Sequence, residues 1–147
     1  MKDWDLYFIE LAKSVAKQNT SCLRRQFGAI LVRDDNSIIS TGYNGSVQGF
    51  PCCGFRKFCW RERNQIPSGN QIEKCYAVHA EQNALMFAAK HGVSVNGATC
   101  YVNGRPCSIC LKLLIQSGVK RLVYTGDYPI NWTPYEDLEK MLEVKKY

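Results

Sequence analysis

The spacing of apolar and polar residues over the first third of the chain predicts one helix and one β-hairpin. Apolar residues recur every three to four positions over Trp4–Lys17, which is the period of an amphipathic helix. Two short β-rich runs, Gly28–Val32 and Ser37–Thr41, flank the turn-forming residues Asp34-Asp35-Asn36 and therefore predict two paired strands. The Gly-Tyr-Asn-Gly sequence at 42–45 is expected to end the second strand in a tight turn.

The second half of the chain alternates between helical and strand patterns, with a turn at Asn96-Gly97. Its predicted elements are helices at His79–His91, Cys107–Ser117 and Pro134–Leu142, and strands at Ala98–Val102 and Arg121–Tyr124. Strands that alternate with helices pair in parallel, because the helix carries the chain back along the sheet. The pattern therefore predicts an α/β fold of three layers, and residues 1–147, without repeats, are expected to form one domain.

Composition indicates a globular chain and also bears on the cellular compartment in which the protein works. Apolar residues make up 46% of the chain and charged residues 22%, which excludes a disordered polymer. No apolar run is long enough to span a membrane, and the acids within the first 13 residues argue against a signal peptide. We therefore expect a cytoplasmic protein, in which eight cysteines indicate metal before disulfides. The net charge of +6 suits an anionic partner but carries little weight alone.

A short set of metal-binding residue types stands out from this background. His79 and Glu81 form an H-x-E sequence, and Pro106, Cys107 and Cys110 form a later P-C-x-x-C sequence. Together these sequences are the signature of zinc-dependent deaminases. One histidine and two thiolates suit zinc and leave a fourth position for water, as in catalytic zinc sites. Both sequences are expected to begin helices, so that two positive helix ends converge on the metal.

Glu81 is predicted to be the catalytic residue rather than a fourth zinc ligand. On a regular helix, a residue two positions after His79 does not share its face. We expect Glu81 to take a proton from the zinc-bound water and deliver it to a ring nitrogen of a nucleobase, while the hydroxide attacks the carbon that carries the amine. The alternatives are a structural zinc knuckle, or a buried histidine beside two core cysteines.

An irregular stretch, residues 46–76, separates the hairpin from the zinc motif and has no clear period. Long loops of this kind need a function or a cross-link. Its cysteines, with one cysteine before the first strand, are candidates for a second, structural zinc with four ligands. The candidate ligands are Cys53, Cys59 and Cys75, with Cys22 or Cys52 as the fourth. The alternative is that these cysteines are reduced, half-buried core residues.

Most of the chain, from about Ser21 to Tyr128, resembles the deoxycytidylate (dCMP) deaminase family. The zinc motif is shared by the whole cytidine deaminase superfamily, whereas Gly42-Tyr43-Asn44-Gly45 and the long Cys-containing loop narrow the resemblance to the dCMP branch. The other matching segments are Ser21–Arg25, Gly28-Ala29, Cys75, Gln82–Ala84, Gly97–Thr99, Tyr101-Val102, Ser108-Ile109 and Gly118–Arg121. The resemblance implies the cytidine deaminase fold, with a mixed five-stranded sheet between helices, and hydrolysis of dCMP to dUMP.

The resemblance also implies roles for individual residues. It makes His79, Cys107 and Cys110 the zinc ligands and Glu81 the proton shuttle. The implied nucleotide contacts are Asn44 for the sugar, Arg24 or Arg25 for the 5′-phosphate, and Tyr128 at the border of the site. Solvated charge is the alternative role for the two arginines, and plain packing is the alternative for the tyrosine.

Regulation and assembly are further implications of the resemblance. In many members of the family dCTP activates and dTTP inhibits, and the effector site includes the positions of Gly42, Tyr43, Asn44 and Gly45. Tight-turn geometry alone is the alternative explanation of these four residues. Family members form homo-oligomers, often hexamers.

One segment departs from the family pattern, and this departure leaves more than one candidate for the substrate. The family usually has Tyr-Val-Thr before its Pro-Cys sequence, whereas this chain has Asn103, Gly104 and Arg105 after Val102. Gly104 is expected to loosen the approach to the zinc helix, and Arg105 adds a charge near the pocket. The alternatives to dCMP are therefore CMP or dCTP. A tRNA or RNA base deaminase and an inactive zinc scaffold are also considered, but the Cys-rich loop favours a free nucleotide and Glu81 speaks against a scaffold.

Overall fold

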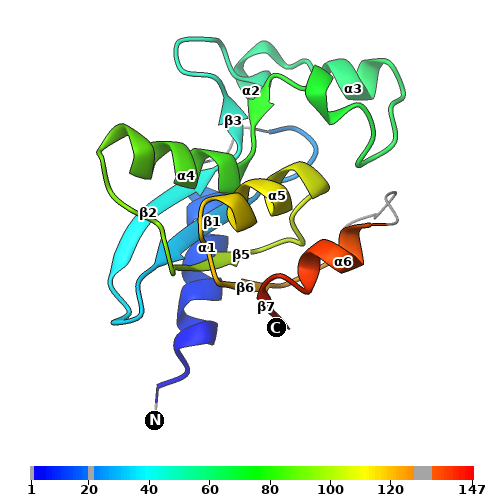
Figure 1. Cartoon of the computed structure of the whole chain (residues 1–147). Coiled ribbons are helices and arrows are strands. Elements are labelled where there is room, and N and C mark those ends of the chain that lie inside the picture. Colours follow the sequence, from blue (N-terminus) through cyan, green and yellow to red (C-terminus); the bar gives the residue numbers. More distant parts are fainter. Residues whose placement is uncertain (1, 20–21, 128–133) are drawn as a thin grey trace.

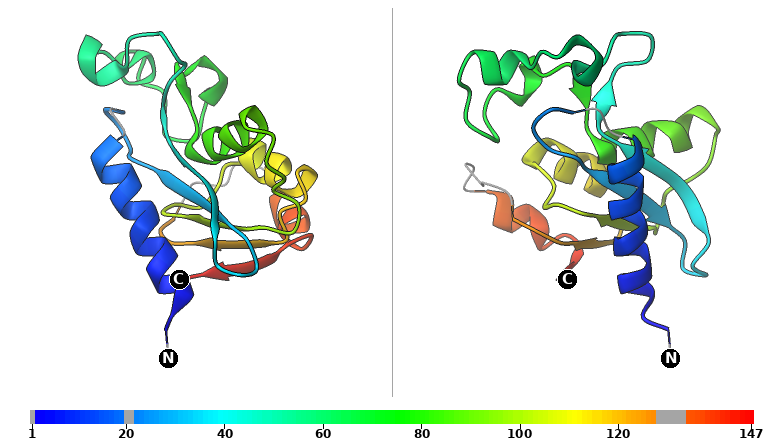
Figure 2. Two further views of the ribbon diagram at one scale, coloured as in Figure 1. Left: turned by 90° about the vertical axis from the view of Figure 1, so that its left-hand side faces the viewer. Right: turned by 180° about the vertical axis from the view of Figure 1, so that it is seen from behind.

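The computed structural model describes residues 2–19, 22–127 and 134–147, and its centre is a sheet with helices on both faces (Figure 1, Figure 2). The helices are α1 (Trp4–Asn19), α2 (Cys53–Arg56), α3 (Trp60–Arg63), α4 (Ala80–Lys90), α5 (Ser108–Gln116) and α6 (Tyr135–Glu139), with a 3-10 turn η1 at Ile72–Lys74. The strands are β1 (Gly28–Val32), β2 (Ile38–Tyr43), β3 (Gly45–Ser46), β4 (Ala77–Val78), β5 (Thr99–Val102), β6 (Arg121–Tyr124) and β7 (Glu143–Lys146).

The main sheet has five strands in the order β2-β1-β5-β6-β7. β1 pairs antiparallel with both β2 and β5, and the remaining pairs, β5–β6 and β6–β7, are parallel. The hairpin prediction and the prediction of parallel pairing in the second half are both confirmed. The antiparallel half and the parallel half meet at β5, which makes the sheet mixed.

Side chains of the central strands alternate between the two faces of this sheet. Ala29 and Leu31 of β1 belong to one buried cluster with α4, α5 and Tyr135 of α6, whereas Ile30 and Val32 belong to a second cluster with α1. All of β1 is buried because helices cover both faces. The predicted three-layer α/β fold is therefore confirmed, with the zinc-motif helices in one outer layer and α1 in the other (Figure 2).

The predicted tight turn at Gly42–Gly45 is wrong, because the chain stays extended there. β2 continues through Tyr43, and after one residue Gly45 begins β3, which pairs with β4. The chain turns later, where the Phe50 N–H donates to the Val47 carbonyl at 3.0 Å. These residues therefore lead the chain straight from the sheet toward the start of α4.

Two glycines allow helices to lie directly on the strands. A Cβ atom at Gly42 would stand 2.2 Å from the carbonyl oxygen of Ala80, so β2 and α4 approach closely only because Gly42 has none. A Cβ atom at Gly28 would likewise stand 2.2 Å from the carbonyl oxygen of Ala12 in α1. Packing, rather than turn geometry, explains why a glycine occupies position 42.

The end of the chain differs from its prediction. α6 covers only Tyr135–Glu139 of the predicted helix Pro134–Leu142, and β7 follows at Glu143–Lys146 as the edge strand. Three of the four β7 residues are charged, so no apolar pattern indicated a strand. The other predicted helices and strands lie within two residues of their predicted bounds. Within the described ranges, no helix has the length and apolar character needed to cross a membrane.

Candidate metal centre

The residues of the zinc motif lie at the starts of two helices, as predicted. His79 occupies the N-cap of α4, and Cys107 occupies the N-cap of α5. The side-chain oxygen of Gln82 accepts a hydrogen bond from the His79 N–H at 2.9 Å and so fixes the first turn of α4. α4 and α5 contact each other on the same side of the sheet, and their N-termini bring His79, Cys107 and Cys110 together (Figure 1).

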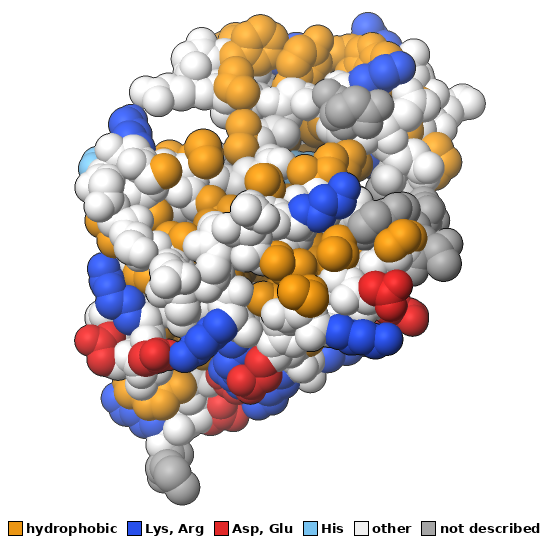
Figure 3. Space-filling view, viewed as in Figure 1, with side chains coloured by type: hydrophobic (Ala, Val, Ile, Leu, Met, Phe, Trp, Pro, Cys, Tyr) orange, Lys and Arg blue, Asp and Glu red, His pale blue; other side chains and the backbone are white. Residues whose placement is uncertain are grey.

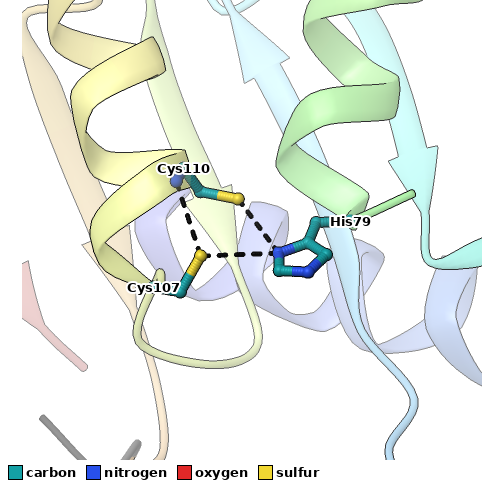
Figure 4. Close-up of side chains that lie close together, drawn as sticks. All are labelled: His79, Cys107 and Cys110. Atoms are coloured by element: carbon teal, nitrogen blue, oxygen red, sulfur yellow. Dashed lines mark hydrogen bonds between the residues drawn. The ribbon is translucent and has the colours of Figure 1, made fainter. Parts of the chain in front are cut away.

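The three side chains point toward one another with the geometry of a metal site (Figure 4). His79 Nδ1 lies 3.2 Å from Cys110 Sγ and 3.5 Å from Cys107 Sγ. All the candidate ligand atoms lie within 4.8 Å of one another, and in the described part of the chain this is the one group of three or more such residues that meets this distance. One imidazole and two sulfurs are a donor set that suits zinc. These residues therefore fit the metal that the sequence predicts.

Electrostatics in the site also suit a cation. The hydrogen bond from Cys110, together with the nearby His79 ring, outweighs burial and lowers the pKa of the Cys107 thiol to about 4. Cys107 is therefore a thiolate at neutral pH, which is the form that binds metal. Burial opposes charge on the His79 ring, but the hydrogen bond and charge of Cys107 outweigh it, and the pKa of His79 is raised. Metal binding would displace a proton from the His79 ring and the proton of the Cys110 thiol, whose pKa the hydrogen bond with Cys107 and burial raise well above its ordinary value.

Glu81 lies beside the metal ligands but is not one of the compact group. It occupies the first turn of α4 with only 5% of its surface exposed. Burial raises the pKa of its carboxyl above the ordinary value, and the charge of His79 acts in the opposite direction. A buried carboxyl with a raised pKa, next to a metal site, has the properties of a general acid and base.

A cavity opens onto this centre and is lined by most of the residues predicted to bind substrate. His79, Glu81 and Cys107 form its metal end, and the segment from Cys22 to Phe27, the start of β3 and parts of the long loop form the remaining wall. Arg24, Arg25, Asn44 and Gly45 all line it. Gly42 and Tyr43 are not among its lining residues, and Tyr128 lies outside the described residues.

Asn44 is buried and braces the cavity wall. Its Oδ1 accepts from the Phe27 N–H at 2.8 Å, and its Nδ2 donates to the Arg25 carbonyl at 2.9 Å. The neighbouring Tyr43 carbonyl accepts from Asn83 Nδ2 of α4 at 2.7 Å. The segment predicted to contact sugar and effector is therefore tied both to the cavity wall and to the zinc helix.

The cysteines of the long loop gather at the same cavity without forming a compact metal group. Cys22, Cys53, Cys59 and Cys75 line the cavity. Cys52 instead caps α2, where its sulfur accepts from the Phe55 N–H at 3.3 Å. Among the described residues, no set of three loop cysteines meets the distance found at His79. The second, structural zinc stays a prediction.

The segment before the zinc helix is held by contacts that no sequence pattern revealed. Arg105 donates from Nε and Nη2 to one carboxylate oxygen of Glu139, at 3.0 and 2.8 Å. The Tyr135 hydroxyl donates to the Pro106 carbonyl at 2.5 Å. Both partners, Tyr135 and Glu139, lie in α6, far along the chain. The helical spacing of these two residues is the only sequence signal that could have suggested the contacts. α6 therefore braces the entry to α5.

Gly104 plays a different part from the one expected. It is buried, and a Cβ atom there would stand 2.4 Å from the ring of Phe27. The residue does not simply loosen the approach to the zinc helix. Its missing side chain makes room for an aromatic ring that lines the cavity.

The fold and the site together define a class: three-layer α/β proteins whose His-Cys-Cys group suits zinc and lies beside a buried carboxyl, which is the residue set of zinc-dependent deaminases. Residues 2–126 match the family described as "Cytidine and deoxycytidylate deaminase zinc-binding region". The chain belongs to the cytidine and deoxycytidylate deaminase family. This confirms the resemblance found in the sequence and the zinc that it implies.

Individual relatives agree with this assignment. The chain is 38% identical over 125 residues to a deoxycytidylate deaminase of Schizosaccharomyces pombe, but spans only 38% of that protein's length. It is 37% identical over 127 residues to a deoxycytidylate deaminase of Mycobacterium phage D29, covering 83% of this chain and 94% of that one. A solved dCMP deaminase of cyanophage S-TIM5, in complex with dCMP and dUMP, has a TM-score of 0.76 and 28% identity, over 100% of this chain and 99% of that one. The cytidine deaminase-like fold is therefore confirmed.

Proposed function

We propose that this chain hydrolyses dCMP to dUMP and ammonia, with residues 1–147 acting as one zinc-dependent domain. The observation that carries the proposal is the cavity, whose metal end contains His79, Cys107 and Glu81 and whose wall carries arginines. If the cytosine of dCMP lies at the metal end, the 5′-phosphate of the same nucleotide is left to interact with the arginines. The S-TIM5 relative, solved with dCMP and dUMP, supports the same pair of substrate and product.

The chemistry follows from the positions of a few side chains. Zinc held by His79, Cys107 and Cys110 would supply a Lewis acid that lowers the pKa of a water molecule to about 7. Glu81 takes the proton from the attacking water and delivers it to the ring nitrogen of cytosine. Glu81 then takes the second proton, from the hydroxyl now bound to the ring carbon, and transfers it to the amine; the bond between carbon and amine breaks, the carbonyl of dUMP forms, and ammonia departs. Burial raises the pKa of the Glu81 carboxyl, and a general acid and base acts best when its pKa lies near the working pH.

Substrate contacts are proposed for residues that line the cavity. We propose that Asn44 contacts the sugar and Arg24 or Arg25 the 5′-phosphate, as the family resemblance implies; all three residues line the cavity. Tyr128 remains a proposed border residue. CMP and dCTP are the alternative substrates, but Arg105 gives them little support, because its guanidinium already pairs with Glu139 at 2.8 Å. An RNA base remains an alternative for the assay to decide.

Regulation by dCTP and dTTP is proposed through the segment Gly42–Gly45. Asn44 and Gly45 line the cavity, while Gly42 packs on α4 and the Tyr43 carbonyl binds Asn83 of α4. A nucleotide that displaced this segment would therefore act on the helix that carries His79 and Glu81. This connection supports an effector role for these residues.

We propose that the chain acts as a homo-oligomer, such as the hexamers that the family resemblance implies. α4 and α5 expose apolar side chains, among them Met86 (59% exposed) and Leu113 (43% exposed). Figure 3 shows hydrophobic side chains gathered on the face that these helices share. A cytoplasmic location is also proposed, because the thiol ligands of the metal need a reducing compartment.

The assay that tests this function is ammonia release from dCMP, CMP, dCTP, cytidine and a tRNA transcript, each with and without dCTP or dTTP as effector. Turnover of dCMP that changes with the triphosphates supports both substrate and regulation. Preferred turnover of dCTP or CMP contradicts dCMP as the substrate. Turnover of the tRNA alone contradicts the nucleotide function, and turnover of no substrate by zinc-loaded protein contradicts the deaminase function.

A further inference from the structure

We propose that Arg61, on the short helix α3 of the long loop, binds the substrate's 5′-phosphate together with Arg24. The inference rests on the proposed function, because it names the side chain with which the same cavity selects a nucleotide over a nucleoside. Arg61 belongs to the irregular loop, and neither its spacing nor a motif marks it in the sequence.

Arg61 and Arg24 reach the same cavity from separate parts of the chain. Both line it, together with His79 and Glu81 at its metal end. The carboxylate of Glu62, the next residue in α3, lies 3.8 Å from Arg24 Nε, so α3 contacts the segment that carries Arg24. Figure 1 shows α3 in the lobe that projects beyond the sheet.

Both arginines have buried N–H groups that no described residue accepts. Nη1 of Arg24 and Nε of Arg61 are inaccessible to solvent and lack a hydrogen-bond partner. Buried polar groups in native proteins are almost always satisfied, so these N–H groups call for a partner from outside the chain, such as a ligand or a water molecule. The Nε of Arg56 is unsatisfied too, but its guanidinium packs over the Tyr76 ring at 4.4 Å and does not line the cavity. Arg24 and Arg61 therefore differ from Arg56, because their unsatisfied N–H groups belong to side chains that line the cavity.

The balance of charge points to an anion. Four arginines line the cavity, Arg24, Arg25, Arg61 and Arg105, against the single carboxylate of Glu81. Arg105 is neutralised by Glu139, and Arg24 is paired only loosely with Glu62. In the described part of the chain, Arg61 has no ion pair.

A phosphate monoester suits the guanidinium groups of Arg24 and Arg61 better than a carboxylate or a nucleobase. Its oxygens accept hydrogen bonds from two guanidinium groups at once, and its charge of about −2 offsets both. The metal end fixes the cytosine, so the 5′-phosphate is the part of the nucleotide left for the arginines. Because Arg61 sits on α3, phosphate binding would also hold the long loop over the cavity.

The test compares Arg61→Gln with Arg63→Gln, two positions further along α3. Arg63 stacks on the Phe58 ring at 4.3 Å and does not line the cavity, so it matches Arg61 in type and element. In zinc-loaded protein, dUMP affinity is measured by calorimetry, and kcat/KM for dCMP and deoxycytidine by ammonia release. Losing a charge-assisted hydrogen bond to phosphate lowers affinity by about 10- to 100-fold. Arg61→Gln should show this loss with dUMP and dCMP, but not with deoxycytidine.

The outcomes separate this inference from the proposed function. Arg61→Gln protein that binds dUMP as tightly as Arg63→Gln protein overturns the role of Arg61, as does an equal loss on dCMP and deoxycytidine. If Arg61→Gln lowers zinc content or melting temperature, Arg61→Lys decides: recovery of dUMP binding supports the role, and failure to recover contradicts it. Wild-type protein that binds dUMP but does not deaminate dCMP contradicts the proposed function and leaves the Arg61 comparison intact.

Discussion

At the scale of single residues, Glu81 is the side chain on which the proposed reaction depends most. Replacing it by glutamine keeps its size but removes its ability to accept a proton. We expect Glu81→Gln to lower kcat by about 10²–10⁴, the range for a general acid and base. Zinc content should stay unchanged, because Glu81 lies outside the compact ligand group. Ammonia release and metal analysis on the same preparation test this, and a kcat near that of wild type would show that another group moves the proton.

Gly42 and Gly45 provide a second test at the residue scale, because one is packed tightly and the other is not. A Cβ atom at position 42 would stand 2.2 Å from backbone of α4, whereas one at position 45 would meet only the Tyr43 ring, at 3.7 Å. We expect Gly42→Ala to destabilise the protein by about 1–3 kcal/mol, the usual cost of overpacking. Gly45→Ala should stay within about 0.5 kcal/mol of wild type. Denaturant unfolding measures both, and equal stability of the two variants would contradict the packing explanation of Gly42.

At the scale of elements, Asp5 joins α1 to three strands of the sheet. Its carboxylate accepts from Arg121 at 2.7 and 2.8 Å, from the Tyr101 hydroxyl at 2.9 Å and from Lys145 at 2.8 Å. The Arg121 hydrogen bonds, aided by Lys145 and Tyr101, hold the pKa of Asp5 well below its ordinary value of about 4. The contribution of these bonds to the free energy of unfolding is complete at neutral pH. It decreases as the pH falls below about 4, because Asp5 takes up a proton in the unfolded chain before it does so in the folded protein.

Asp5→Asn should therefore be less stable at pH 7 by about 1–3 kcal/mol, and should lose less further stability on acidification than wild type. The control is Asp34→Asn, whose exposed pair with Lys120 is expected to contribute less than about 1 kcal/mol. Urea unfolding at several pH values between 7 and 2 gives both results. Parallel loss of stability in the wild-type and Asp5→Asn proteins would show that Asp5 does not stabilise α1 on the sheet.

The elements also show which features a sequence of this kind reveals. Long periodic segments such as Trp4–Lys17 were predictable because each buries one face, and the H-x-E and P-C-x-x-C sequences located the metal centre because zinc accepts few donor types. The strand at Glu143–Lys146 was not predictable, because it is short, charged and paired on one side only. The tight turn expected at Gly42–Gly45 failed because a glycine serves close packing as well as turns. Arg61 was missed because its position depends on tertiary contacts of a loop.

At the scale of the whole molecule, the number of zinc ions per chain decides how the long loop is held. The prediction of a second, structural zinc requires Cys53, Cys59 and Cys75, with Cys22 or Cys52, to come together at the cavity wall. Four of these five cysteines already line the cavity. Burial and the neighbouring Arg56 and Cys75 act on Cys53, and burial, the largest influence, raises the pKa of its thiol. Zinc binding there would have to displace that proton.

Metal analysis should then give two zinc ions per wild-type chain and one in Cys53→Ser. His79→Ala should also retain one, because it removes only the catalytic site. The control is Cys100→Ala, a fully buried core cysteine on β5, which should lose stability but no zinc. One zinc per chain in the wild type, lost in His79→Ala and kept in Cys53→Ser, would show that the loop is held without metal. In that case the exposed loop would depend on its own side-chain contacts, such as the stacking of Phe50 on Tyr76 at 5.1 Å, to stay over the cavity.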